Sequence, residues 1–418
     1  MAQCRRYSLA PNIPHPHEIA WVFVTQCARF FKSSLERGDL MNKVLGVLAL
    51  FLSLLPFGVH SANCKNALER LENSRLRSSV LLARGGRPAI LNGYPLHFTS
   101  NPVIPQIWLT RPGNGSEYFV VEKGSMGFGF SPPPTSRFRL IDDETIHLRS
   151  LDFSGDNQNL MATLIAQDSE TGEAVALLKL VNIGDSDTGE LQLLGVPGLE
   201  IRGIHQNADK LVVTARMSTK EFWITDGGKK IRIVELQESG EPLLKTEINL
   251  SKQVDSVTKI QFFQSGEAGY LRLKRKGGSW AIVPFYLSYP KSEEAKTPVI
   301  PTLKIDWEKA YEMKEDYVRT SVHPSEPIIV ISYKDHIEAL GFNIETQTFT
   351  KVLDQKIDFL TDGQEILGVE YYWNGALQKV KTEEGVKQIF VGNVEAALLV
   401  GQNNRNSTLL YWLDVKGK

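Results

Sequence analysis

Cysteine is scarce in this sequence, with three residues among 418. Cys4 and Cys27 precede the one long hydrophobic run of the chain, so the body of the protein retains only Cys64. A single cysteine cannot form an intrachain disulfide, and the paired cysteines of a zinc site are missing as well. The fold must therefore be held together by a hydrophobic core and by hydrogen bonds.

The signature motifs of several enzyme classes are also missing. The sequence has no Gly-x-Ser-x-Gly elbow, no Walker phosphate loop, no His-Glu-x-x-His motif and no Ser-x-Asp-x-Gly-x-x-x-Trp box of the sialidase type. Each of these motifs positions the groups that carry out one chemistry. Residues 185–190, Asp-Ser-Asp-Thr-Gly-Glu, come nearest to a calcium loop, but a solvated hairpin turn needs the same residues. We therefore assign no catalytic residue, no metal and no cofactor.

A strong charge of either sign is lacking too. The formal net charge is -1, and residues 1–61 carry six basic and three acidic side chains, so the remainder has a net charge of -4. Proteins that bind nucleic acids gather Lys and Arg against the phosphates. A mildly acidic body predicts no nucleic-acid partner.

The one long hydrophobic run follows Met41 and Lys43 and ends at Pro56. A basic start, an apolar stretch too short to span a membrane comfortably and an exit into small residues are typical of a secretory signal peptide. We assign residues 41–61 to this peptide and expect cleavage after Ser61 or Ala62. Residues 1–40 are then a leader without a folded role or a gene-model extension, with Met41 as the true start.

This pattern predicts a mature protein that is periplasmic or secreted and has no stable membrane span. An uncut membrane anchor is one alternative. A lipid anchor on Cys64 is another, although Asn63 departs from the small residue that a bacterial lipobox requires at that position. Residues 67–76 place leucines at helical spacing among charges, which predicts a short helix before the first strand.

Residues 146–195 contain four strand patterns in succession. Apolar runs at 146–153, 160–166, 174–181 and 190–194 are separated by polar turns rich in Gly, Asp, Ser and Asn. Four short strands in about fifty residues form an antiparallel meander, and a meander repeated at that period is typical of propeller blades. Similar units are expected at 91–141, 199–236, 257–285, 317–353 and 357–380, with three further strands between 387 and 413.

Three of the turns have related sequences: Phe153-Ser154-Gly155-Asp156, Val322-His323-Pro324-Ser325 and Leu360-Thr361-Asp362-Gly363. Each follows an apolar strand and precedes another. They resemble the Ser-Pro-Asp-Gly turns of WD40-like and TolB-like β-propeller repeats, over most of the chain after residue 90. The resemblance implies an all-β fold and a binding scaffold, and it assigns no individual residue to a function.

The predicted fold is a propeller over residues 90–418 with about seven four-stranded blades, or six if the last two units merge. Because a propeller closes by leaving no free edge, the last blade needs a strand from the other end of the chain. The segment 62–89, with its strand pattern at 79–84 and a further one at 88–91, is expected to supply the short helix and this closing strand.

Polar residues on the expected innermost strands are the candidate binding site, because those strands line the central channel. They are Arg149, Asp152, Arg202, His205, Lys259, Arg319, His323 and Asp358. Buried charges need partners or water, so these side chains are expected to form a network in the channel or at its mouth. A network that only joins the blades is the alternative to a ligand site.

The sequence thus favours an exported, non-catalytic, monomeric propeller that binds a protein or a cell-envelope ligand. The alternative is a propeller enzyme, lactonase-like or glycan-cleaving, with acid and base groups converging at the channel mouth.

Overall fold

The described part of the chain lies in the larger of its two compact units, residues 71–418. The computed structural model describes residues 82–95, 97–101, 106–111, 117–124, 127–130, 138–140, 145–155, 159–183, 191–204, 210–216, 219–288, 301–315, 317–382 and 385–415. The predictions that fall outside these residues concern the leader 1–40, the signal peptide 41–61, Cys64, the helix 67–76, the acidic turn 185–190 and His205.

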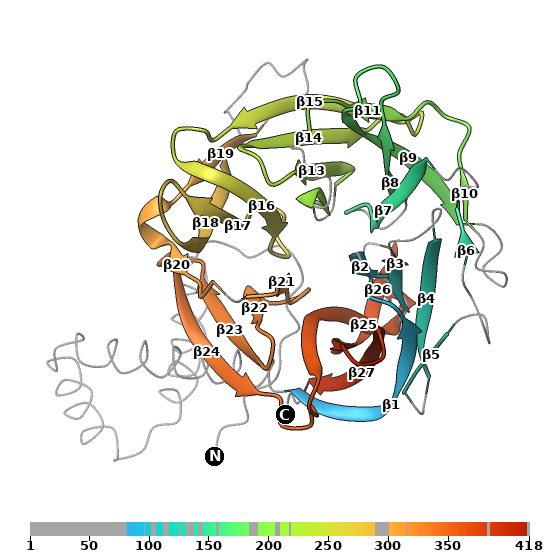
Figure 1. Cartoon of the computed structure of the whole chain (residues 1–418), viewed down its shortest axis with the longest axis vertical. Helices are drawn as coiled ribbons and strands as arrows, with labels where there is room; N and C mark the ends of the chain where they lie inside the picture. The colour runs from blue at the N-terminus through green and yellow to red at the C-terminus, as the bar shows by residue number, and fades with distance from the viewer. Residues whose placement is uncertain are drawn as a thin grey trace, which may run out of the picture. The chain divides into compact units, whose positions relative to one another are not determined.

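Six antiparallel blades of about four strands each are arranged in a ring (Figure 1). Apart from a short 3-10 turn, η2 (Trp307–Lys309), the regular structure of the described residues consists of strands. The all-β class and the propeller fold are therefore confirmed, with the blade count at the alternative value of six. Strand β1 also makes one parallel contact with β5, which links the first and last blades into one continuous sheet.

The first three blades follow one another along the chain. Blade 1 contains β2 (His97–Ser100), β3 (Gln106–Arg111), β4 (Glu117–Gly124), β5 (Gly127–Phe130) and β6 (Phe138–Arg139). Blade 2 contains β7 (Ile146–Phe153), β8 (Leu160–Gln167), β9 (Ala174–Ile183), β10 (Leu191–Leu193) and β11 (Leu199–Ile201). Blade 3 contains β12 (Val212–Ala215), β13 (Glu221–Thr225), β14 (Lys230–Leu236) and β15 (Pro242–Asn249).

The last three blades complete the circle. Blade 4 contains β16 (Val254–Phe262), β17 (Ala268–Arg275), β18 (Trp280–Ser288), β19 (Thr302–Ile305) and β20 (Tyr311–Glu312). Blade 5 contains β21 (Arg319–Val322), β22 (Ile328–Ser332), β23 (His336–Asn343) and β24 (Thr348–Lys356). Blade 6 contains β25 (Gln364–Thr382), β26 (Gly385–Gln402), β27 (Ser407–Val415) and β1 (Leu82–Asn92).

The core of the described residues is divided among the contacts between neighbouring blades. Successive side chains of a strand point to opposite faces, so one strand supplies two of these contacts. In β26, Ala396, Leu398 and Val400 pack against blade 5, whereas Ala397 and Leu399 pack against blade 1. This is why the run 396–400 is apolar throughout instead of alternating with polar residues.

The predicted closure by an N-terminal strand is confirmed. Strand β1 pairs antiparallel with β27 at eight positions, from Leu82 opposite Val415 to Asn92 opposite Ser407. The ladder shifts register between Gly85 and Ala89. Gly93 N–H donates to Asn406 O, and the Thr408 hydroxyl donates to Gly93 O, so the ladder ends in a fixed turn.

The count of six results from a merger of the last two sequence units. The Asn374-Gly375 pair, a strong hairpin signal, lies inside β25, where it pairs with Asn393 and Gly392 of β26. The strands run on together to Thr382 and Gly385, so one long hairpin replaces the two units expected at 357–380 and 387–413.

Two innermost strands begin later than the sequence suggested. Residues 199–201 form β11, which pairs with β9 at the outer side of blade 2, and the innermost strand of blade 3 is β12. Residues 357–360 form no strand, and the innermost strand of blade 6 is β25. In both places the sequence pattern predicts an innermost strand in a short apolar segment, whereas the innermost strand is the next one along the chain.

Candidate functional site

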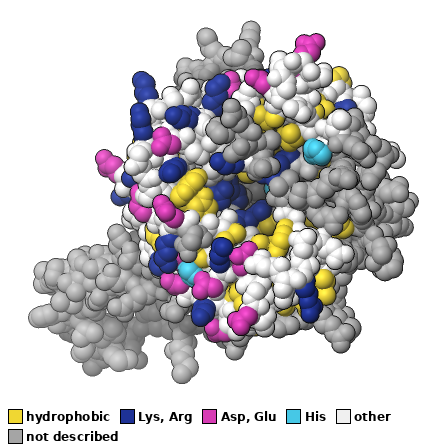
Figure 2. Space-filling model, viewed as in Figure 1, with side chains coloured by type: hydrophobic (Ala, Val, Ile, Leu, Met, Phe, Trp, Pro, Cys, Tyr) yellow, Lys and Arg dark blue, Asp and Glu magenta, His cyan; other side chains and the backbone are white. Residues whose placement is uncertain are grey.

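The central channel encloses a cavity of about 550 Å³. All six blades line it, through β2, β7, β12, β16, β21 and β25, with further residues from β17 and β18. Lys and Arg side chains gather at this central hollow (Figure 2). The lining contains the cations Arg149, Lys210, Lys259, Arg272 and Arg319 and the carboxylates Asp152 and Glu370.

Five of the eight predicted site residues line this cavity: Arg149, Asp152, Lys259, Arg319 and His323. Two do not, because their segments are not innermost strands. Arg202 is an exposed residue at the outer side of blade 2, where its guanidinium pairs with Asp168 at 2.6 Å and with Glu200 at 3.2 Å. Asp358 is exposed in the turn before β25. His205 lies outside the described residues.

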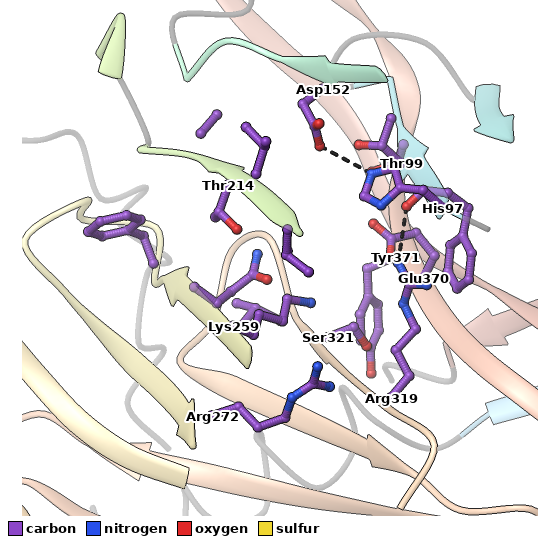
Figure 3. A pocket seen from close by; sticks show the side chains of 18 of the residues that line it. His97, Thr99, Asp152, Thr214, Lys259, Arg272, Arg319, Ser321, Glu370 and Tyr371 are labelled. Atoms are coloured by element: carbon purple, nitrogen blue, oxygen red, sulfur yellow. Dashed lines mark hydrogen bonds and ion pairs between the residues drawn. The ribbon is translucent and has the colours of Figure 1, made fainter. Parts of the chain in front are cut away.

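A histidine and a carboxylate meet on one side of the channel. His97 on β2 and Asp152 on β7 are joined by a hydrogen bond of 3.1 Å between Nε2 and Oδ1 (Figure 3). The Ser150 hydroxyl donates to the other carboxylate oxygen at 2.6 Å. Burial lowers the pKa of His97 and outweighs the opposing effect of Asp152, so the ring is neutral at pH 7. Because a carboxylate only accepts, Nε2 carries the proton and Nδ1 is left as an acceptor.

Arg319 on β21 reaches across to β2. Its guanidinium lies 3.5 Å from the centre of the Phe98 ring and donates to the Phe98 carbonyl at 3.3 Å. Gly368 makes room for this stack, because a Cβ there would lie 2.8 Å from Arg319 Cδ and 2.9 Å from the Phe98 ring. Burial lowers the pKa of Arg319 to about 10, so the side chain keeps its charge at neutral pH.

Lys259 on β16 and Arg272 on β17 converge on Thr320. The ammonium of Lys259 donates to the Thr320 carbonyl at 2.6 Å. Arg272 donates to Thr258 Oγ1 at 3.0 Å, and its Nη1 lies 3.5 Å from Thr320 Oγ1. Burial, followed by the charges of Arg319 and Arg272, lowers the pKa of Lys259 well below its ordinary value. The fold therefore holds several cations close together at an energetic cost.

Glu370 on β25 is the carboxylate that acts most strongly on the pKa values of Lys259 and Arg319. It lies deep in the channel, yet its side chain is only half-buried because it faces the cavity. Burial raises the pKa of Glu370 to about 7, against the opposing effects of Arg319 and Lys259. At neutral pH the Glu370 carboxyl is therefore divided between its protonated and ionised forms.

Glu370→Gln is expected to change how stability depends on pH. The pKa of Glu370 is higher in the folded chain than its ordinary value of 4.5, so its contribution to stability is fully present below pH 4.5 and is lost as pH rises through 7. Glutamine resembles the protonated form at every pH. Thermal unfolding at pH 5 and pH 8 should show the variant close to the wild type at pH 5 and more stable at pH 8. A pH-independent difference would contradict this.

Three important lining residues were missed by the sequence argument. His97 lies within the first unit expected, 91–141, but was not singled out. Glu370 lies within the apolar run 366–372 of the unit expected at 357–380, and this run belongs to the innermost strand, β25. Arg272 belongs to a second strand and reaches the channel through the length of its side chain. A charged residue inside an apolar run is the sequence feature that could have marked Glu370 as a residue of the channel.

One cluster of possible metal ligands occurs among the described residues, away from the channel. The ligand atoms of His336, Glu338 and Asp354 lie within 4.8 Å of one another. Lys351 and Lys314 lie 3.0 and 3.4 Å from Glu338 Oε1, so ammonium groups already neutralise this carboxylate. The cluster is accounted for by these ion pairs.

A search of the described residues for a helix long and apolar enough to cross a membrane finds none.

No family model and no curated protein matches the chain. Among solved structures, it is similar to the WD40 domain of coronin from Toxoplasma gondii, at 10% identity over 80% of this chain and 90% of that chain, with a TM-score of 0.42. Sqt1 from Saccharomyces cerevisiae is 8% identical over 78% and 99%, with a TM-score of 0.39. A Bacteroides uniformis protein described as a possible 6-phosphogluconolactonase is 14% identical over 78% and 81%, with a TM-score of 0.38. At these scores the assignment of the fold rests on the six blades themselves.

Proposed function

We propose that the mature chain is an exported, non-catalytic propeller that binds a protein or a cell-envelope ligand at its central channel. The observation that carries this proposal is the cavity of about 550 Å³, to which all six blades contribute and into which charged side chains face. Cavities of this size are typical of ligand sites, which combine apolar walls with a few polar groups. Phe98, Phe262 and Trp280 supply such walls here.

Export is proposed from the signal-peptide pattern at residues 41–61, with a mature chain that starts at Ala62 or Asn63 in the periplasm or outside the cell. A lipid anchor on Cys64 remains the alternative. We also propose that the protein acts as a monomer. The exposed large apolar side chains of the described residues are Ile90, Leu243, Leu244 and Ile344, and they form no extended patch on one blade.

A propeller enzyme is the second candidate, favoured by the His97–Asp152 pair. A histidine held by a carboxylate, with its other nitrogen free to accept a proton, is the usual form of a general base. A glycan-cleaving enzyme would need two carboxylates, and Asp152 and Glu370 both line the channel. A lactonase-like reaction would need the base and a group that stabilises the oxyanion, for which the channel cations are suited.

Filling the channel is expected to abolish binding. Gln261→Trp places a large side chain at the cavity wall, whereas Gln237→Trp makes the same change at an exposed turn. Each protein is purified from the envelope or medium fraction, where mass spectrometry should identify Ala62 or Asn63 as the first residue. An extract of that fraction should raise the melting temperature of the wild type and of Gln237→Trp by several degrees, and leave that of Gln261→Trp unchanged.

Equal stabilisation of both variants would contradict a ligand site in the channel. Mass spectrometry of the extract after incubation separates the two functions. A compound that disappears with the wild type but persists with Gln261→Trp would favour the enzyme. A first residue before Met41 would contradict the proposed processing.

A further inference from the structure

Buried arginines outside the channel are neutralised by carboxylates. Arg232, of which 2% is exposed, pairs with Asp226 at 2.7 Å and with Glu247 at 2.9 Å. Arg216, of which 8% is exposed, pairs with Glu221 at 2.7 Å. This is the expected arrangement, because a buried charge without a counter-charge costs several kcal/mol.

The channel departs from this arrangement. Within the described residues, Lys259, Arg272 and Arg319 have no carboxylate within ion-pair distance. Their partners are instead neutral: the carbonyls of Thr320 and Phe98, the hydroxyls of Thr258 and Thr320, and the rings of Phe98 and Tyr317. Three basic side chains from β16, β17 and β21 thus face one cavity without an ion-paired carboxylate, and the lowered pKa of Lys259 reflects the cost of holding them close together.

The carboxylates of the channel do not restore the balance. Asp152 on β7 accepts hydrogen bonds from His97 and Ser150, which are both neutral, so it keeps its negative charge and raises the pKa of Lys259, but it forms no ion pair with Lys259, Arg272 or Arg319. Glu370 on β25 faces the cations, but its raised pKa keeps part of it uncharged at pH 7. The remaining lining cations, Arg149 and Lys210, add to the positive charge.

A buried donor without a partner lies in the same wall. Ser321 on β21 lines the cavity and is only 4% exposed, and its hydroxyl makes no hydrogen bond within the described part of the chain. Figure 3 shows it between Arg319 and Tyr371. Buried hydroxyls without a hydrogen-bond partner are rare in native proteins, but Thr163 and Thr225 share this feature away from the channel, so the basic side chains remain the observation that points to a ligand.

We propose that the channel binds a small organic compound through an oxyanion, a phosphate or a carboxylate, which is received by Arg272, Lys259 and Arg319. This inference rests on the proposed function, since it takes the channel to be the ligand site. Guanidinium groups donate paired hydrogen bonds that match both kinds of oxyanion. Trp280, Tyr317 and Phe262 line the adjoining wall, so the body of the compound is apolar or aromatic.

The size of the cavity sets the scale of the compound. About 550 Å³ falls within the range of small-molecule sites, and it is too small for a nucleic-acid duplex or a whole folded domain, so of the two proposed kinds of ligand it favours a small cell-envelope compound over a protein. Lys259, Arg272 and Arg319 share this cavity with the carboxylates Glu370 and Asp152, and a bound anion would raise the lowered pKa of Lys259 toward its ordinary value. A dianion does this more strongly than a monoanion. A phosphate monoester is therefore expected to bind more tightly than a carboxylate of the same shape.

The test is calorimetric titration of the mature chain, residues 62–418, with phenyl phosphate, phenylacetate and phenol at pH 7. Phenyl phosphate should bind most tightly, phenylacetate more weakly, and phenol without measurable heat. Lys259→Met and Arg319→Gln should each weaken phosphate binding about tenfold or more. Lys304→Met removes an exposed lysine of β19 and should leave binding unchanged.

A gain-of-binding variant excludes misfolding as the explanation. Glu370→Gln removes the negative charge that faces the cations, and at pH 8 it should bind phenyl phosphate several-fold more tightly than the wild type. Equal losses in Lys259→Met and Lys304→Met would overturn the inference, and so would phenol binding as well as the two anions. If anions fail to bind while Gln261→Trp still abolishes stabilisation by the extract, the channel takes an uncharged ligand and the proposed function stands. If both tests fail, the channel is not a ligand site.

Discussion

Deletion of residues 1–92 is expected to leave the propeller unfolded at room temperature, whereas deletion of residues 1–61 leaves the mature chain fully folded. The first deletion removes β1 and opens blade 6 along the whole of β27, where eight residue pairs are now joined. Deletion of residues 408–418 removes the other partner of the same ladder. It should have an effect of similar size, since both deletions expose an edge of the closed ring.

The magnitude follows from what β1 contributes. A backbone hydrogen bond adds about 0.5–1.5 kcal/mol net, and a fully buried leucine about 1.5–3 kcal/mol. Leu91 and Ala89 are both at most 6% exposed and belong to the core between blades 6 and 1. Loss of the ladder and of these contacts approaches the whole stability of an ordinary domain, about 5–15 kcal/mol.

Two neighbouring residues of β1 provide a matched control. Leu91→Ala removes a buried side chain and should lower the free energy of unfolding by about 2–5 kcal/mol. Ile90→Ala changes a side chain that is 60% exposed and should cost less than about 0.5 kcal/mol. Urea denaturation measures both. Near-equal effects of the two substitutions, or cooperative unfolding of the 1–92 deletion near the wild-type melting temperature, would show that blade 6 does not depend on β1.

The closure was predictable from sequence because it follows from counting strands. The last unit had three strand patterns and an unused one lay before residue 92, so one edge could be paired with the other. The number of blades was harder to predict. Asn374-Gly375 has the local signature of a hairpin, but the pairing with β26 continues across it, and that pairing is not a local property of the sequence.

The residues of the candidate site could be predicted from the sequence wherever the innermost strand was placed correctly. Arg149, Asp152, Lys259 and Arg319 lie on β7, β16 and β21, whose strand patterns are clear, and all four line the cavity. Arg202 and Asp358 were misplaced because each lies within a short apolar segment, 199–204 or 357–360, that resembles an innermost strand. Because the innermost strand of blade 6 was expected at 357–360, Glu370 on β25 was not among the predicted site residues. No sequence pattern shows that the channel cations lack counter-charges.

That imbalance leads to a second large effect, which is measured by making the same substitution at the buried Arg232 and at the half-buried Arg319. Arg232→Met should lower the free energy of unfolding by about 3–5 kcal/mol, because it removes the guanidinium that forms ion pairs with Asp226, of which 4% is exposed, and with Glu247. Arg319→Met breaks no ion pair with a buried carboxylate. Glu370, the nearest anion in influence, has a pKa of about 7 that the loss of Arg319 raises further, so it can take up a proton and remain uncharged.

Arg319→Met should therefore cost about 1 kcal/mol or less at pH 7, mainly from the lost stacking on Phe98. Methionine preserves much of the apolar length of arginine at both positions, so the comparison isolates the charge. Urea denaturation of the two variants at pH 7 gives both values. A loss at Arg319 as large as that at Arg232 would mean that the channel cations stabilise the fold as they stand. The channel cations would then need no further negative charge, and there would be no reason to expect an anionic ligand.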